Sequence, residues 1–74
     1  MQQYEIVCTY LNGCAGAAHP IRTFEEVKIG NTDDYIRAKH DIDFDKFVKE
    51  IQADGRIVYT FSDTVTYIYE FTEI

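Results

Sequence analysis

The feature that most constrains this chain is an alternation of aromatic and branched residues over its C-terminal part. The residues on one side of the alternation are Ile57, Tyr59, Phe61, Val65, Tyr67, Tyr69 and Phe71. A period of two predicts β-strands that turn one face toward a core, here Arg56–Phe61 and Val65–Ile74. We predict a three-residue loop at Ser62-Asp63-Thr64, which places Tyr59 opposite Tyr67 in a C-terminal β-hairpin.

Two further strands are predicted in the first half of the chain. Residues Gln3–Leu11 alternate in the same way, and one face carries Tyr4, Ile6, Cys8 and Tyr10. The dipeptide Asn12-Gly13 favours a hairpin turn because both residues tolerate positive φ. Between Ile21 and Ile29, alternation competes with a helix-capping pattern at Thr23-Phe24-Glu25-Glu26. We favour a strand, since a helix ended by Gly30 would be short.

One main helix is predicted, from Asp43 to Asp54. Its apolar residues recur at i, i+3, i+4 and i+7 and form one stripe, Phe44, Phe47, Val48 and Ile51. Asp43 suits the N-cap, and Gly55 suits the position after the last turn. We expect the polar segment Asn31–His40 to be a loop with at most a short turn of helix or strand. The predicted fold is α+β: an antiparallel sheet of three to four strands with the helix, about 43–54, packed on one face.

Size and charge limit what such a domain can do. The chain has 74 residues, 46% apolar and 15% aromatic, which suits a single small globular domain spanning residues 1–74. So small a core leaves little room for a deep catalytic cleft, and we expect a protein that is not an enzyme. The net charge of −6 disfavours direct binding to nucleic acid or to an anionic membrane. No leader peptide or apolar span is visible, so we expect a cytoplasmic protein with reduced cysteines.

Three chemical alternatives are weighed and disfavoured. A zinc site would draw on Cys8, Cys14, His19 and His40, but the cysteines are further apart than in the usual pair, and a turn between them separates their faces. A nucleophile at Cys14 with His19 as its base lacks a third group to orient the imidazole. Residues 41–45 match the start of a calcium loop, but Lys46 and Gln52 stand where that loop needs glycine and glutamate. We therefore expect no metal and no cofactor.

Acidic residues concentrate in the middle of the sequence. Five aspartates lie between positions 33 and 45, offset there only by Arg37 and Lys39. We expect an electronegative patch that docks on a basic protein surface through Asp33, Asp34, Tyr35, Asp41, Asp43 and Asp45. Tyr35 is included because tyrosine is common at interfaces and we expect this one to be exposed in its polar surroundings. The competing interpretation is a solvated face that confers solubility.

These features favour a small acidic interaction module, most specifically an inhibitor that occludes a basic partner surface. Alternate carboxylates on an extended segment lie about 6.6 Å apart, of the order of phosphate spacing, so the partner could be a nucleic-acid-binding protein. Small acidic inhibitors of this kind are encoded by phages and mobile elements against host defence systems, which is an analogy and not a resemblance in sequence. The alternative is a structural subunit that forms a homodimer through the C-terminal hairpin, using Val58, Ile68 and Ile74.

Overall fold

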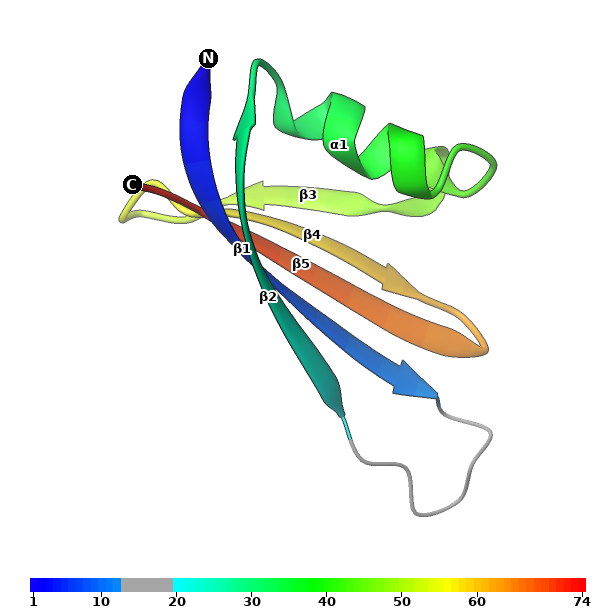
Figure 1. The fold of residues 1–74 in the computed structure, drawn as a ribbon. Helices are drawn as coiled ribbons and strands as arrows, with labels where there is room; N and C mark the ends of the chain where they lie inside the picture. The colour runs from blue at the N-terminus through cyan, green and yellow to red at the C-terminus, as the bar shows by residue number, and fades with distance from the viewer. Residues whose placement is uncertain (13–19) are drawn as a thin grey trace.

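A computed structural model describes residues 1–12 and 20–74 of the protein. The described residues form β1 (Gln2–Asn12), β2 (Ile21–Ile29), α1 (Thr32–Lys39), the short 3-10 helix η1 (Phe44–Lys46), β3 (Val48–Ile51), β4 (Ile57–Ser62) and β5 (Val65–Glu73). The strands make one antiparallel sheet in the order β2-β1-β5-β4-β3 (Figure 1). The α+β class is confirmed, but this part of the chain holds five strands and not three to four.

The core lies on the face of the sheet that carries the alternating aromatic residues. Its most buried side chains are Ile6, Ile36, Tyr59, Phe61, Tyr69 and Phe71. Rings meet edge to face, as in the contact between Tyr59 and Phe71, whose centroids are 5.5 Å apart. Ile36 of α1 is completely buried in the same cluster, so the helix shares the core of the sheet (Figure 1). The predicted core face is therefore correct for β4 and β5, and Tyr4, Ile6 and Cys8 of β1 join the same core.

The helix predicted over 43–54 is wrong, because that segment is η1 followed by the edge strand β3. Phe44 and Phe47 pack against the core, but Val48 and Ile51 are 60% and 70% exposed. The helical spacing of these four residues is a coincidence of sequence. The open edge of β4 offers hydrogen-bonding partners to residues 48–51, and this tertiary pairing outweighs the local helical pattern.

Gly55 acts in a hairpin turn and does not end a helix. Its backbone has φ of +92°, in the left-handed region that glycine occupies without strain. The Gly55 N–H donates to the carbonyl of Gln52 at 2.9 Å, and the Gln52 N–H donates to the carbonyl of Arg56 at 2.8 Å. This pattern is that of a three-residue hairpin loop between β3 and β4.

The observed helix α1 occupies the segment that was expected to be a loop. Asn31 is its N-cap, and the Asn31 side chain accepts the N–H of Asp33 at 2.8 Å. Asp33 and Asp34 in the first turn, with Arg37 and Lys39 in the last, complement the helix dipole. The aspartates that suggested a binding patch thus also stabilise the start of a helix.

The strand predictions for 3–11 and 21–29 are confirmed, whereas the predicted register of the C-terminal hairpin is wrong. Tyr59 lies opposite Tyr69, and Phe61 lies opposite Tyr67, two residues from the predicted pairing. A slip of two residues keeps every side chain on its own face, so hydrophobic alternation alone does not distinguish the two registers. The turn predicted at Asn12-Gly13 extends beyond the described residues.

Candidate functional site: an acidic and aromatic pocket

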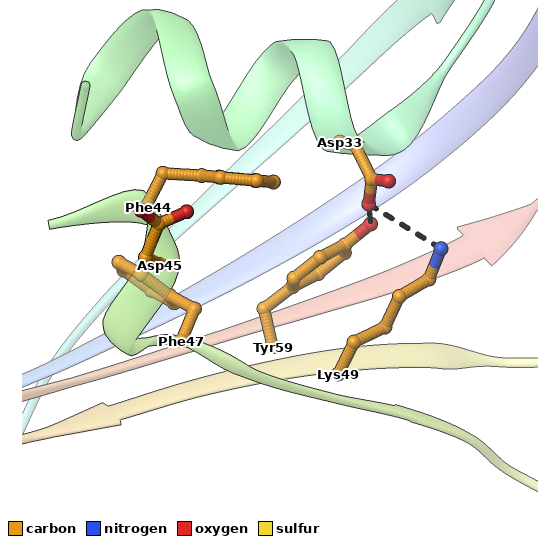
Figure 2. Close-up of a pocket in the computed structure, with 6 residues that line it drawn as sticks. All are labelled: Asp33, Phe44, Asp45, Phe47, Lys49 and Tyr59. Carbon is orange, nitrogen blue, oxygen red and sulfur yellow. Dashed lines mark hydrogen bonds and ion pairs between the residues drawn. The ribbon is translucent and has the colours of Figure 1, made fainter.

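A pocket of about 270 Å³ lies where α1, η1, β3 and β4 meet. Its lining residues are Asp33, Phe44, Asp45, Phe47, Lys49 and Tyr59. Figure 2 shows Asp33 next to Tyr59 and Lys49 on one side, with Asp45 and the two phenylalanine rings on the other. The volume is just below the range of about 300–1,000 Å³ typical of small-molecule sites. The pocket therefore suits an inserted side chain better than a cofactor.

Asp33 is the most constrained of the acidic residues predicted from the sequence. The hydroxyl of Tyr59, a residue only 2% exposed, donates a short hydrogen bond to the Asp33 carboxylate. The same hydroxyl lies 2.8 Å from Oγ1 of the buried Thr32, which therefore donates to it. Lys49 Nζ lies 3.3 Å from Asp33 Oδ1 (Figure 2).

These contacts fix the charge of Asp33. The hydrogen bond from Tyr59, assisted by Lys49, holds the pKa of Asp33 below its ordinary value although partial burial acts in the opposite direction. Burial, followed by the nearby Asp33 carboxylate, raises the pKa of Tyr59, so its hydroxyl remains a donor. Asp33 is therefore an anion that belongs to the fold as much as to the surface.

The other four aspartates of the predicted patch differ in their surroundings. Asp34 Oδ1 lies 3.5 Å from Nη1 of the arginine one turn later in α1. Asp43 Oδ1 lies 3.7 Å from Nζ of the lysine three residues later. Asp41 and Asp45 are exposed and form no ion pair within the described part of the chain. Three of the five aspartates are therefore paired, and Asp41 and Asp45 are the two that keep an unpaired charge within the described residues.

Tyr35 was expected to be exposed, and that expectation is wrong. Its ring packs edge to face on Phe71, with centroids 5.5 Å apart, as part of the half-buried layer around the core. Its hydroxyl donates to Glu25 Oε1 at 3.0 Å. Burial, reinforced by Glu25, raises the pKa of Tyr35. The residue ties α1 to β2, and the polar sequence around it gave no sign of this because Tyr35 and Ile36 are the inward side of a short helix.

Cations of the chain already lie over aromatic faces in this region. Arg37 Cζ is 4.5 Å from the centroid of Phe44, and Lys49 Nζ is 5.7 Å from that of Tyr59. Such contacts are worth about 0.5–1 kcal/mol at exposed sites and more when water is excluded. Rings and carboxylates around one hollow are the combination that binds ammonium and guanidinium groups.

The sequence analysis did not identify four of the six pocket residues as site residues. Phe44 and Phe47 were assigned to the apolar stripe of a helix, and Tyr59 to the core. Lys49 would have lain on the polar face of that helix. The signal that could have located the pocket is Asn31, whose capping of α1 places Asp33 beside the sheet.

The described residues give no separate centre for metal chemistry. In residues 1–12 and 20–74, no three His, Cys, Asp or Glu side chains are grouped as ligands for an ion. Cys8 is half-buried with a free thiol. The proposed roles of Cys14 and His19 lie outside the described residues.

Searches for related proteins do not bear on the site. Comparison with protein-family models, curated proteins and solved structures gives no match. Within the described residues, no helix is long and apolar enough to cross a membrane.

Proposed function

We propose that the protein is a non-catalytic interaction module whose acidic, aromatic pocket receives a basic side chain of a partner protein. The observation that carries this proposal is that Asp41 and Asp45 are both exposed and form no ion pair in the described part of the chain. Asp45 lines the pocket beside Phe44 and Phe47, and Asp41 lies four residues earlier in the loop after α1. The partner surface is basic, such as the channel of a nucleic-acid-binding protein, and occupation of that surface blocks it.

A guanidinium or ammonium group would gain two kinds of contact in the pocket. Carboxylates accept charge-assisted hydrogen bonds, and ring faces attract the same cation through their quadrupole. Two cations of the chain itself compete for these contacts: Arg37 lies over the Phe44 ring, and Lys49, whose side chain is 41% exposed, lies beside Asp33. An exposed pair of this kind is worth less than about 1 kcal/mol, so an incoming side chain can share Asp33 at small cost.

The charge of the whole molecule supports the same class of partner. A net charge of −6 on a domain of this size attracts basic surfaces and raises association rates at low salt. The paired aspartates still contribute to this long-range field, although their local charge is offset. Binding should therefore weaken as salt rises.

The test compares two double variants with the same change in net charge. The site variant is Asp41→Lys with Asp45→Lys. The control is Asp63→Lys with Glu73→Lys, which changes exposed positions at the β4–β5 turn and at the end of β5. Each immobilised protein is exposed to cell lysate at low salt, and bound proteins are quantified by mass spectrometry before and after a wash in about 0.5 M salt.

The proposal predicts a set of basic proteins that the wild type and the control retain and the site variant loses. The high-salt wash should release that set. If both variants retain the same proteins as the wild type, or lose them equally, the pocket is not the binding site. Asp33 is left unchanged because a lysine at that position would leave the hydroxyl of Tyr59 without its acceptor and disturb the fold.

The alternative of a homodimer through the C-terminal hairpin has less support. Both β4 and β5 have strands on either side of them, so the hairpin has no free edge. Val58 and Ile68 are half-buried on the outer face, and only Ile74 is strongly exposed, at 61%. Among the described strands, β2 is the longer of the two at the edges of the sheet.

A further inference from the structure

β2 is a nine-residue strand at one edge of the sheet. Its nine residues pair with β1 on one side, and no described residue pairs with its other side. Phe24 and Ile21 are 65% and 58% exposed on this strand. A row of unpaired N–H and C=O groups beside exposed apolar side chains is a template for another strand. The opposite edge, β3, has only four residues.

We propose that β2 pairs antiparallel with β2 of a second copy of the chain, in the register that places Phe24 opposite Phe24. In this register Arg22 of each copy faces Glu26 of the other, and Ile21 faces Val27. The two-fold axis is perpendicular to the sheet, so the sheet continues from one copy to the next. Both acidic pockets then lie on the same side of the dimer.

On the face of β1 and β2 that points away from the core, two glutamates lie next to each other, and this register places an arginine beside one of them. Glu26 lies directly opposite Glu5 of β1, and like charges in that position destabilise a sheet. Neither glutamate forms an ion pair within the described residues, and neither does Arg22. Arg22 of the second copy would lie beside Glu26 and offset its charge, which lessens the repulsion between Glu26 and Glu5. Phe24, which lies opposite Val7, would gain a second aromatic neighbour.

Other symmetric registers fit less well. A register about Glu25 places the Glu25 carboxylates of the two copies opposite each other and Arg22 opposite Lys28, so like charges repel at both places. A register about Glu26 brings the two Glu26 carboxylates together. A register about Val27 pairs Glu26 with Lys28 favourably, but joins only five residues of each strand where the Phe24 register joins seven. The charges on β2 and the number of paired residues together favour the register about Phe24.

A charge-swap experiment tests the register. The oligomeric state of the full chain is measured by sedimentation equilibrium over a range of concentrations. The wild type should be a dimer, and Arg22→Glu and Glu26→Arg should each weaken dimerisation by about tenfold or more, because the two-fold symmetry repeats every mismatch. The double variant Arg22→Glu/Glu26→Arg should restore the dimer. Lys28→Glu is the matched control and should dimerise like the wild type, with circular dichroism confirming that each variant is folded.

Each contrary outcome has a definite meaning. A wild type that stays monomeric at the highest attainable concentration overturns the proposal. Loss of the dimer in Lys28→Glu, with no effect of Arg22→Glu, assigns the register about Val27 instead. Failure of the double variant to restore the dimer shows that Arg22 and Glu26 do not face each other. None of these results depends on the acidic pocket, whose capture assay uses different variants.

Discussion

Replacement of Tyr59 by phenylalanine tests how the candidate site is anchored. The ring is nearly completely buried and would keep its place, while the hydroxyl that joins Asp33 to Thr32 would be lost. A hydrogen bond to a charged group contributes about 1.5–3 kcal/mol. Water can reach Asp33, whose side chain is 36% exposed, and this lowers the expected loss to about 2 kcal/mol. For a domain of this size that corresponds to a fall in Tm of about 8–16 °C.

The measurement is urea unfolding of the wild type and of Tyr59→Phe, followed by a thermal melt. Tyr67→Phe is the matched control, because Tyr67 lies on the same face of the sheet and its hydroxyl makes no hydrogen bond within the described residues. The control should change the free energy of unfolding by less than about 0.5 kcal/mol. Equal effects of the two substitutions would refute the role given to the Tyr59 hydroxyl.

A double-mutant cycle isolates the contact itself. Asp33→Asn keeps the shape of the side chain and removes its charge, and the cycle combines it with Tyr59→Phe. We expect a coupling energy of about 1 kcal/mol or more between the two positions. Because the pKa of Asp33 is lowered in the fold, its stabilising contribution is present above pH 3.8 and is lost as the pH falls further. That acid-induced loss should be smaller in Tyr59→Phe.

Three further predictions follow from other parts of the structure. Burial lowers the pKa of His40 from 6.5, so the free energy of unfolding should fall as the pH drops below 6.5. Urea unfolding near neutral pH and at about pH 5 measures this fall, which should be smaller in His40→Gln. Gly55→Ala should cost about 1–2 kcal/mol through its φ of +92°, since the added methyl meets no atom of the described residues within 4 Å beyond its two chain neighbours. An unchanged urea midpoint would contradict this. Lys49→Met removes one competing cation from the pocket and should tighten binding of an arginine-rich peptide severalfold in calorimetry; weaker binding would show that Lys49 assists the site.

The sequence predicts those parts of the fold in which a residue pattern is compatible with only one type of secondary structure. Alternation identified β1 and the C-terminal strands, because a half-buried strand is the structure that a period of two requires. For β2, alternation competed with a helix-capping pattern, and a strand was favoured because a helix ended by Gly30 would be short. The alternation also identified Tyr59, Tyr69 and Phe71 as core. It could not fix the hairpin register, because a slip of two residues leaves every side chain on the same face.

The parts that could not be predicted depend on contacts between distant segments. Phe44, Phe47, Val48 and Ile51 have helical spacing, yet the edge of β4 draws the last two into a strand. The true helix is short, and its signals are a capping asparagine and charges at both ends, which also resemble a polar loop. The sequence shows which residues are acidic, but whether each forms an ion pair depends on basic side chains that folding brings close, such as Lys49 beside Asp33.

Mapping where a basic peptide binds tests most directly whether the acidic, aromatic pocket receives a basic side chain. An arginine-rich peptide is titrated into isotopically labelled protein, and the changes in NMR chemical shift are assigned residue by residue. We predict that the largest changes occur at Phe44, Asp45 and Phe47, that added salt reverses them and that they are lost in Asp41→Lys/Asp45→Lys. Changes spread evenly over all acidic residues, or concentrated on the outer face of the sheet around Glu5 and Glu26, would contradict this prediction.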